Sequence, residues 1–302
     1  MLEATAFHRP GGTAGARNHV LVLPSVVCAA RVARDVATAT GGVSIVHQHG
    51  CSQVGDDAVR TGQVFEDVAC SPNVGATLVI GLGCETLEGH RLASRIEQRG
   101  QSVEFTGIQD AGGSKEAVAT GVAACTRLLA ELAGSERAAV APAKLTIGIE
   151  AARASPLVDA LARRLAEAGA SVALTGHAGG LQDRWSRAAA FSSTPPRPYR
   201  VVLQEAGHGV QQHLALIAAG VQAIVSFPAL DAAPVGSPVC PVLAVRGSSP
   251  LHSALAGDFD LSDGDGIDVL WRRMVETIDG APTVAERLGS SVFALERLAM
   301  TM

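Results

Sequence analysis

Short apolar runs alternate with longer segments of helical periodicity along the whole chain. The runs are rich in β-branched and aliphatic residues, which favours strands, and they lie at 20–27, 43–48, 77–83, 102–109, 144–150, 170–176, 199–204, 223–228 and 242–245. Strands that alternate with helices form parallel sheets through βαβ units. The pattern therefore predicts layered α/β structure from one end of the chain to the other.

Two of the predicted helices carry further signals. The first has apolar residues at helical spacing, namely Val118, Val122, Cys125, Leu129 and Leu132. The second covers 157–165 and begins with Ser155 as a cap and Pro156 in the first turn, while Gly169 follows its end.

A linker of small residues at 134–143 divides the chain. It predicts two doubly wound, mostly parallel-sheet α/β domains of the Rossmann-like class, one over residues 1–140 and one over 141–302. A proline-rich stretch at 192–200 is expected to be an exposed connection within the second domain.

The composition fits a globular protein and excludes several classes. Hydrophobic residues make up 47% and charged residues 18% of the 302 positions, which excludes a disordered chain. With a net charge of -5 and only ten aromatic residues, the chain has neither the basic charge nor the stacking rings that nucleic-acid binding requires. No apolar run approaches about 18 residues, and the six scattered cysteines form no C-x-x-C pair. We expect a cytoplasmic homo-oligomer with neither nucleic acid nor a membrane as partner.

Polar and thiol side chains follow the first three predicted strands. Because ligand crevices of parallel sheets lie at the carboxyl ends of the strands, we expect these side chains to share one crevice. Thiolate, imidazole and carboxylate groups together suit a divalent metal, iron(II) by preference, with zinc or manganese as alternatives. Each residue also has a structural explanation, since a free cysteine commonly packs as a small hydrophobe. The candidates are Cys28, His47, His49, Cys51, Cys84 and Glu85.

The segment 109–117 places Gly112 and Gly113 directly before a predicted helix, with Ser114 as a candidate cap. Backbone N–H groups at such a turn suit the carboxylate of a small acid. A plain strand-to-helix turn explains the glycines equally well.

Other motifs fail or carry no pattern. A dinucleotide fingerprint at 81–86 lacks its third glycine, where Thr86 stands, so a nicotinamide oxidoreductase is disfavoured. The aspartate-rich segment 257–268 lacks the glycine and glutamate of a calcium loop, which favours a solvated loop. The later histidines are His177, His208 and His213, and each of them taken alone is a weak candidate for a functional residue.

Four motifs follow one another before residue 135. They are GTAGARNHVLVLPSVVCAA at 12–30, HQHGCSQ at 47–53, PNVGATLVIGLGCE at 72–85 and IQDAGG at 108–113. In this order they resemble the large domains of altronate and galactarate dehydratases, together with the large subunit of sulfolactate sulfo-lyase.

The resemblance implies a lyase that acts by β-elimination on a small hydroxylated sugar acid or a sulfolactate-like acid. A base removes the proton α to the carboxylate, while a metal-assisted hydroxyl or sulfonate leaves from the neighbouring carbon. The metal ligands it implies are Cys51, His47, Cys84 and Cys28. The substrate-binding residues it implies are Arg17, Asn18, Gln109, Gly112 and Gly113. Candidates for proton transfer are Glu150 and His49.

The second half departs from the family pattern. Where the family carries a cysteine, two glycines, a serine and an aspartate after the strand at 144–150, this chain has Glu150 followed by AARASP. An alternative is therefore a catalytically degenerate member that acts as a binding or regulatory subunit, and an unrelated α/β enzyme is the remaining alternative. The family-like stretch starts near Phe7, so we also expect a separate small, SAF-like N-terminal-type subunit as partner.

Overall fold

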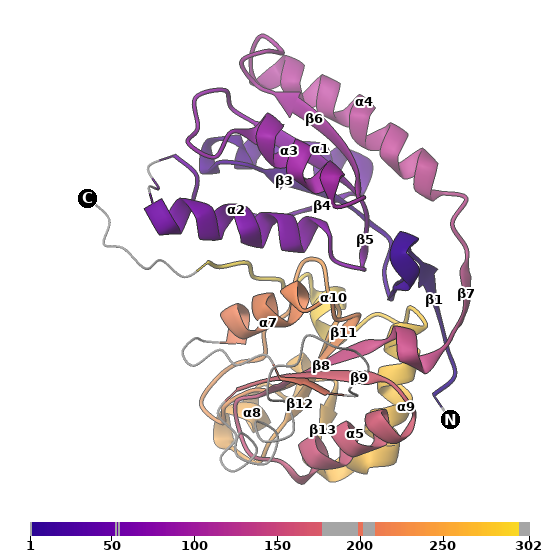
Figure 1. Cartoon of the computed structure of the whole chain (residues 1–302). Coiled ribbons are helices and arrows are strands. Elements are labelled where there is room, and N and C mark those ends of the chain that lie inside the picture. Colours follow the sequence, from indigo (N-terminus) through magenta and orange to yellow (C-terminus); the bar gives the residue numbers. More distant parts are fainter. Residues whose placement is uncertain (1, 52, 54, 177–198, 202–208, 296–302) are drawn as a thin grey trace. The chain divides into compact units, whose positions relative to one another are not determined.

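The computed structural model describes the chain apart from residues 1, 52, 54, 177–198, 202–208 and 296–302 (Figure 1). The chain forms two compact units. The first unit comprises Asn18–Glu136 with Phe293–Met302, and the second comprises Met1–Arg17 with Arg137–Val292. The expected division between 140 and 141 differs from this mainly at the N-terminus, because the first 17 residues lie with the second half of the chain.

A parallel four-stranded sheet forms the centre of the first unit, in the order β4-β3-β5-β6. Helices α1 and α4 share an apolar cluster with β3 and β5, whereas α2 and α3 contact each other. The crossover from β4 to β5 passes β3, so the topological switch point lies between β3 and β5. The bounds are β3 His19–Pro24, α1 Ala30–Thr40, β4 Val43–Ser44, α2 Gly55–Ala69, β5 Val74–Gly81, α3 Gly89–Gln98, β6 Ser102–Gly107 and α4 Ser114–Leu132.

Strand β3 is apolar from Val20 to Pro24, as expected for a strand whose sheet is covered by helices on both faces. Val20 and Val22 join the cluster with α1 and α4, while Leu21 and Leu23 alternate toward the other face. All four side chains are buried. A continuous apolar run of this kind is typical of a parallel strand that is covered on both sides.

The second unit holds a parallel six-stranded sheet in the order β10-β9-β8-β11-β12-β13. Counted along the chain this is the doubly wound order 3-2-1-4-5-6, whose switch point lies between β8 and β11. The strands are β8 Thr146–Ala151, β9 Ser171–Thr175, β10 Tyr199–Val201, β11 Ala223–Phe227, β12 Val242–Arg246 and β13 Leu261–Ser262. The helices are α5 Pro156–Glu167, α7 Gly209–Ala218, α8 Pro250–Ala254, α9 Gly266–Ile278 and α10 Val284–Leu288.

The predicted fold class is confirmed in both units, which are α/β with parallel sheets flanked by helices (Figure 1). Helix α5 begins as its sequence predicts, because the Ser155 side chain accepts a hydrogen bond from the N–H of Leu157 and Pro156 occupies the first turn. Gly169 follows the helix with a φ of 84°, a conformation that favours glycine.

A small antiparallel sheet was not predicted. Strand β1 (Ala4–His8) pairs with β2 (Ala14–Gly15) and with β7 (Arg137–Val140), and β7 lies inside the stretch expected to be a linker. These strands are short and rich in alanine, so local propensity gives no signal and pairing across the chain decides the structure. Their pairing explains why the first residues belong to the second unit.

The aspartate-rich segment is more than a solvated loop. The side chain of Asp260 is 1% exposed and accepts the N–H groups of Ala244 and Val284. Asp263 forms an ion pair with Arg153 at 2.7 Å. The prediction of a solvated loop was wrong for Asp260, because the sequence of an acidic segment does not show which carboxylate meets buried donors.

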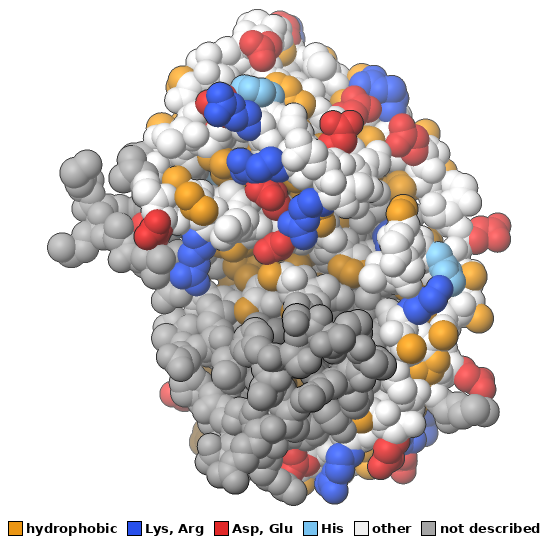
Figure 2. All heavy atoms as spheres, viewed as in Figure 1, with side chains coloured by type: hydrophobic (Ala, Val, Ile, Leu, Met, Phe, Trp, Pro, Cys, Tyr) orange, Lys and Arg blue, Asp and Glu red, His pale blue; other side chains and the backbone are white. Residues whose placement is uncertain are grey.

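The surface carries charges of both signs. On the face seen in Figure 2, basic and acidic side chains lie interspersed. Arg95 and Arg99 of the α3 region pair with Glu66 and Asp67 of α2. Among the described residues, no helix is long and apolar enough to cross a membrane. Most of the expected connection at 192–200 lies outside the described residues, as do His177 and His208.

Candidate active site

Loops that follow adjacent strands are hydrogen-bonded to one another at the carboxyl edge of the first unit's sheet. The N–H of Val27, after β3, donates to the carbonyl of His49, after β4, at 2.9 Å. The N–H of Thr86, after β5, donates to the carbonyl of Gly50 at 3.2 Å. The three loops therefore meet at the switch point, where ligands of doubly wound sheets bind.

Gly50 permits this close approach. A Cβ at this position would lie 2.5 Å from the carbonyl oxygen of Ser25, and the backbone φ is 103°. Both facts require glycine, because a side chain would collide and the conformation is strained for other residues. The H-x-H-G-C motif thus has a structural reason for its glycine.

Three thiols are exposed at this edge. Cys28, Cys51 and Cys84 lie one in each of the three linked loops, whereas Cys125 and Cys240 are buried. Packing as a small hydrophobe therefore explains the last two cysteines and not the first three.

His47 is a buried and fully bonded imidazole. Its Nδ1 accepts the N–H of His49 at 3.2 Å, so Nε2 carries the proton and donates to the carbonyl of Pro24 at 2.7 Å. Burial lowers its pKa to about 4, although the bond to Pro24 opposes this and the neighbouring His49 adds to it. His47 is therefore neutral at pH 7, and both of its ring nitrogens are used within the protein.

His49 is held by a second side chain. Its Nδ1 lies 3.1 Å from the amide nitrogen of Gln53, and the oxygen of the same amide accepts the N–H of Gly50 at 3.2 Å. An amide nitrogen only donates, so Nδ1 is the acceptor and Nε2 carries the proton. In this tautomer the ring is neutral, and its Nε2–H is a hydrogen-bond donor.

Glu85 fastens the loop after β5. Its carboxylate accepts the N–H groups of Leu82, Gly83 and Gly89 and the hydroxyl of Ser25, at 2.6 to 3.2 Å. Burial alone would raise its pKa, but the hydrogen bonds from Gly83, the backbone of Glu85, Ser25 and Gly89 outweigh burial and lower it. The carboxylate is an anion that binds protein donors, which leaves it little capacity as a metal ligand.

The predicted glycine turn lies directly before α4. The N–H of Gly112 donates to the carbonyl of Gln109, and the N–H of Gly113 donates to the carbonyl of Ile108. Both glycines have positive φ angles, and Gly113 rather than the expected Ser114 occupies the cap position. The two glycine N–H groups are thus used by the turn itself. Gln109 joins this turn to the neighbouring loop, because its N–H donates to the carbonyl of Leu82 at 3.1 Å.

Two predicted substrate-binding residues lie away from this edge. Arg17 belongs to the second unit, where its guanidinium donates to both carboxylate oxygens of Glu286 and to the carbonyls of Ala16, Thr277 and Ala281.

Asn18 precedes β3 and lies beside Gly75, at the start of β5. It is therefore at the amino ends of the strands, opposite the linked loops. The structure does not bring Arg17 or Asn18 to the edge that carries the three exposed thiols.

The four predicted metal ligands do not form a metal centre as they lie. Among the described residues, no group of three or more His, Cys, Asp or Glu side chains could hold a metal ion. His47 would first have to give up one of its two hydrogen bonds. Cys28, Cys51 and Cys84 are accessible donors, but the arrangement does not gather them with an imidazole.

The second unit has a polar cluster at its own switch point. Glu150 ends β8 and accepts a hydrogen bond from Ser226 of β11, and His213 of α7 lies 3.9 Å from the same carboxylate oxygen. All three side chains are buried. Sequence reasoning singled out Glu150 and missed Ser226, although a hydroxyl inside the apolar run AIVSF was a usable signal.

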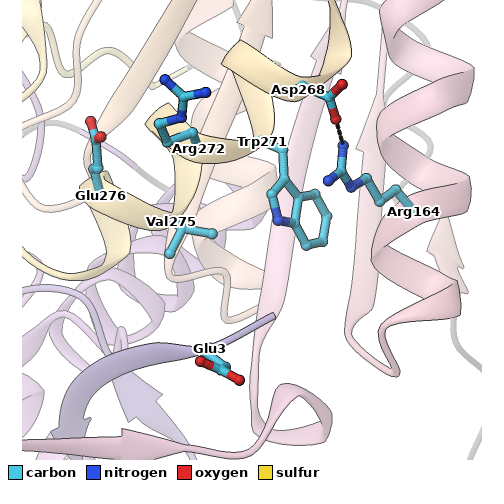
Figure 3. Close-up of a pocket in the computed structure, with 7 residues that line it drawn as sticks. All are labelled: Glu3, Arg164, Asp268, Trp271, Arg272, Val275 and Glu276. Carbon is cyan, nitrogen blue, oxygen red and sulfur yellow. Dashed lines mark hydrogen bonds and ion pairs between the residues drawn. The ribbon is translucent and has the colours of Figure 1, made fainter. Parts of the chain in front are cut away.

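A shallow hollow of about 590 Å³ lies elsewhere on the second unit, between α5 and α9. Figure 3 shows Arg164 beside Asp268 and Trp271, with the ion pair at 2.6 Å and the guanidinium 4.6 Å from the ring centre. None of the predicted site residues lines it. The lining residues are Glu3, Arg164, Asp268, Trp271, Arg272, Val275 and Glu276.

The first unit is therefore a doubly wound α/β domain that presents three thiols and a bonded histidine pair where such domains bind small molecules. Residues 6–133 match the family model described as the second domain of D-galactarate dehydratase/altronate hydrolase. Over these residues the chain is similar to that family, which supports the resemblance carried by the four motifs.

Curated relatives agree with the family model. An altronate dehydratase of Bacillus subtilis is 30% identical over 189 residues, which are 56% of this chain and 37% of that protein. An altronate dehydratase of Escherichia coli is 39% identical over 94 residues, 28% of this chain and 19% of that protein. The beta subunit of (2R)-sulfolactate sulfo-lyase from Chromohalobacter salexigens is 32% identical over 110 residues, 35% of this chain and 27% of that protein. The chain thus spans well under half the length of each relative.

Proposed function

We propose that this chain is a lyase, or the large part of one, that removes water from a small hydroxylated sugar acid or sulfite from a sulfolactate-like acid. The observation that carries the proposal is that the family match over 6–133 contains all the linked loops with their thiols and histidines. The names of the relatives, altronate dehydratase and sulfolactate sulfo-lyase, support the same reaction type.

The residues of the first unit would act on the leaving group. His49, whose ring is held by Gln53, would stabilise the leaving group as the C–O or C–S bond breaks. His47 keeps His49 in position, because its own Nδ1 accepts the backbone N–H of His49. Glu85 supports the same edge by fixing the loop after β5.

The divalent metal is a separate part of the proposal. Soft thiolate donors at an exposed edge favour iron(II) or zinc, and Cys51, Cys84 and Cys28 are such donors. His47 does not fit as a ligand in its present bonds, so no step of the proposed reaction depends on the metal.

A separate small subunit is also part of the proposal. It is supported by the relative that is itself named a beta subunit, which implies a further subunit in that enzyme. The remaining expectations, a cytoplasmic location and a homo-oligomer, stay predictions.

Turnover by the full chain tests the proposal. The purified protein is incubated with altronate, galactarate and sulfolactate, with and without an added small subunit, and the keto acid or sulfite formed is measured. We expect turnover of one acid and a fall of about 100-fold or more in His49→Asn, the range for loss of a group that stabilises developing charge.

His90→Asn is the matched control, because His90 is an exposed histidine of the same unit whose side chain is 63% accessible. Binding of an acid without turnover under every condition would replace the lyase with the binding or regulatory alternative. Equal losses in both variants would contradict the role of His49.

A further inference from the structure

Three polar residues stand side by side at the switch point of the six-stranded sheet. Glu150 of β8 is the register partner of Ser226 in β11 and of Thr175 in β9. Register partners on adjacent parallel strands direct their side chains to the same face. Helix α7 packs on β8 and β9 and supplies His213 to this face, so four side chains capable of hydrogen bonding meet where doubly wound sheets bind their ligands.

Among the described neighbours, Ser226 alone fixes the Glu150 carboxylate by a hydrogen bond. The hydroxyl of Ser226 donates to Oε2, and Nε2 of His213 lies 3.9 Å from the same oxygen. That separation is beyond a hydrogen bond but within an ion-pair contact. A displacement of less than about 1 Å would bring the imidazole N–H into contact with the carboxylate.

His213 differs from a structural buried histidine of the same unit. Its side chain is 4% exposed, yet neither ring nitrogen has a hydrogen-bond partner among the described residues. His252 is equally buried, but its Nδ1 accepts the N–H of Gly247 and its Nε2 lies 3.0 Å from the carbonyl of Ala229. Buried polar groups without partners are uncommon, and a catalytic role is one of the recognised reasons for them.

We propose that His213 is a catalytic acid–base residue for the elimination and that Glu150, held by Ser226, is its positioning residue. The inference rests on the proposed lyase function. It assigns the residue that removes the α-proton of the substrate. Glu150 orients the ring so that Nε2 carries the proton toward the carboxylate, which leaves the lone pair on Nδ1 for the substrate.

The proton balance closes without a further reactant. Nδ1 of His213 takes the proton α to the substrate carboxylate, and the electron pair of that C–H bond forms the new carbon–carbon double bond. The bond to the β-hydroxyl breaks, and the hydroxyl takes the same proton back from Nδ1 of His213 and leaves as water, which returns His213 to its neutral form. In a sulfolactate-like acid the C–S bond breaks instead, and the same proton leaves with hydrogen sulfite.

The test begins with turnover and with exchange of the α-hydrogen for deuterium in heavy water. We expect His213→Gln to lower both rates by about 100-fold or more, the range for loss of a general base. Glu150→Gln keeps a partner for Ser226 and should lower kcat by about tenfold while KM stays unchanged. Ser253→Ala, which removes an exposed hydrogen bond to the carbonyl of Ser249 in the same unit, is the control and should stay within about twofold.

A second measurement on the full chain does not need turnover. Nitrogen-15 shifts of the His213 ring report its tautomer, and we expect the Nε2–H form in the wild type and a loss of that preference in Glu150→Gln. A wild type without any lyase activity would refute the proposed function, while the tautomer would still decide whether the pair exists. An Nδ1–H ring, or full activity of folded His213→Gln, would overturn the inference.

Discussion

A buried carboxylate lies at each of the two switch points, and the two carboxylates differ in the hydrogen bonds that they accept. Glu85 in the first unit accepts four hydrogen bonds, three of them from backbone N–H groups, and is thereby part of the framework. Glu150 in the second unit accepts one hydrogen bond from a side chain and faces a histidine without partners among the described residues. A carboxylate whose acceptors are all used stabilises a fold, whereas one with a single fixed oxygen retains capacity for chemistry.

The thiols provide the largest expected contrast between the two units. Exposed Cys28, Cys51 and Cys84 lie at the first switch point, while Cys240 of the second unit is buried. If these thiols hold a divalent metal, Cys51→Ser removes a soft ligand and should abolish binding of iron(II) or zinc by protein purified without oxygen. Metal content per chain, measured by elemental analysis, checks this.

Cys240→Ser is the control for that measurement, because its sulfur lies in the core of the other unit. Wild-type protein with well under one equivalent of metal would rule the metal out. Equal loss of metal in both variants would show that folding, rather than a ligand, was affected.

The next largest difference is expected in the free energy of unfolding when Glu85 or Glu150 is replaced. Glu85→Gln should lower the free energy of unfolding by about 2 kcal/mol, because an uncharged amide replaces an acceptor of charge-assisted hydrogen bonds and brings its own donors. Glu150→Gln should cost less than about 1 kcal/mol, since the amide oxygen still accepts from Ser226. Denaturant unfolding of the two variants measures the difference.

The pH dependence of stability checks the same contrast. The hydrogen bonds on Glu85 lower its pKa in the folded protein below the usual value of 4.5, despite burial, so its contribution is complete above that value and is lost as the pH falls through the lowered pKa. Between pH 7 and pH 3 the wild type should therefore lose stability more steeply than Glu85→Gln. Parallel curves would show that Glu85 is not held as an anion.

The fold could be predicted from the sequence because each long strand is an apolar run between helices. Strand β8 and helix α5 show this, since their boundaries follow from TIGIE, Ser155 and Pro156. Strands β1 and β7 could not be predicted, because alanine-rich pairs form only when residues more than a hundred positions apart meet. The local sequence of these strands carries no signal for that pairing.

The candidate site was predictable in part for a related reason. Residues that follow strands, such as Cys51 and His49, could be placed at one edge from the order of the elements alone. Arg17 and Asn18 precede the first strand, so the same order of elements already places them at the opposite strand ends. No sequence signal showed that Arg17 lies in the other unit, because that depends on the long-range pairing of β1 with β7. The partners of Glu150 required the register between β8 and β11, which no sequence pattern contains.

Ser25 provides the smallest and most specific contrast. Its hydroxyl is one of four donors to Glu85, at 2.9 Å, and three backbone donors remain when it is removed. Ser25→Ala should therefore cost about 1 kcal/mol of unfolding free energy, roughly the value of one net hydrogen bond, and less than Glu85→Gln. Ser94→Ala, which removes only an exposed bond to the carbonyl of His90, is the control and should be close to neutral. If Ser25→Ala were as costly as Glu85→Gln, the backbone donors would not hold the carboxylate by themselves, and Glu85 would depend on one side chain as Glu150 does.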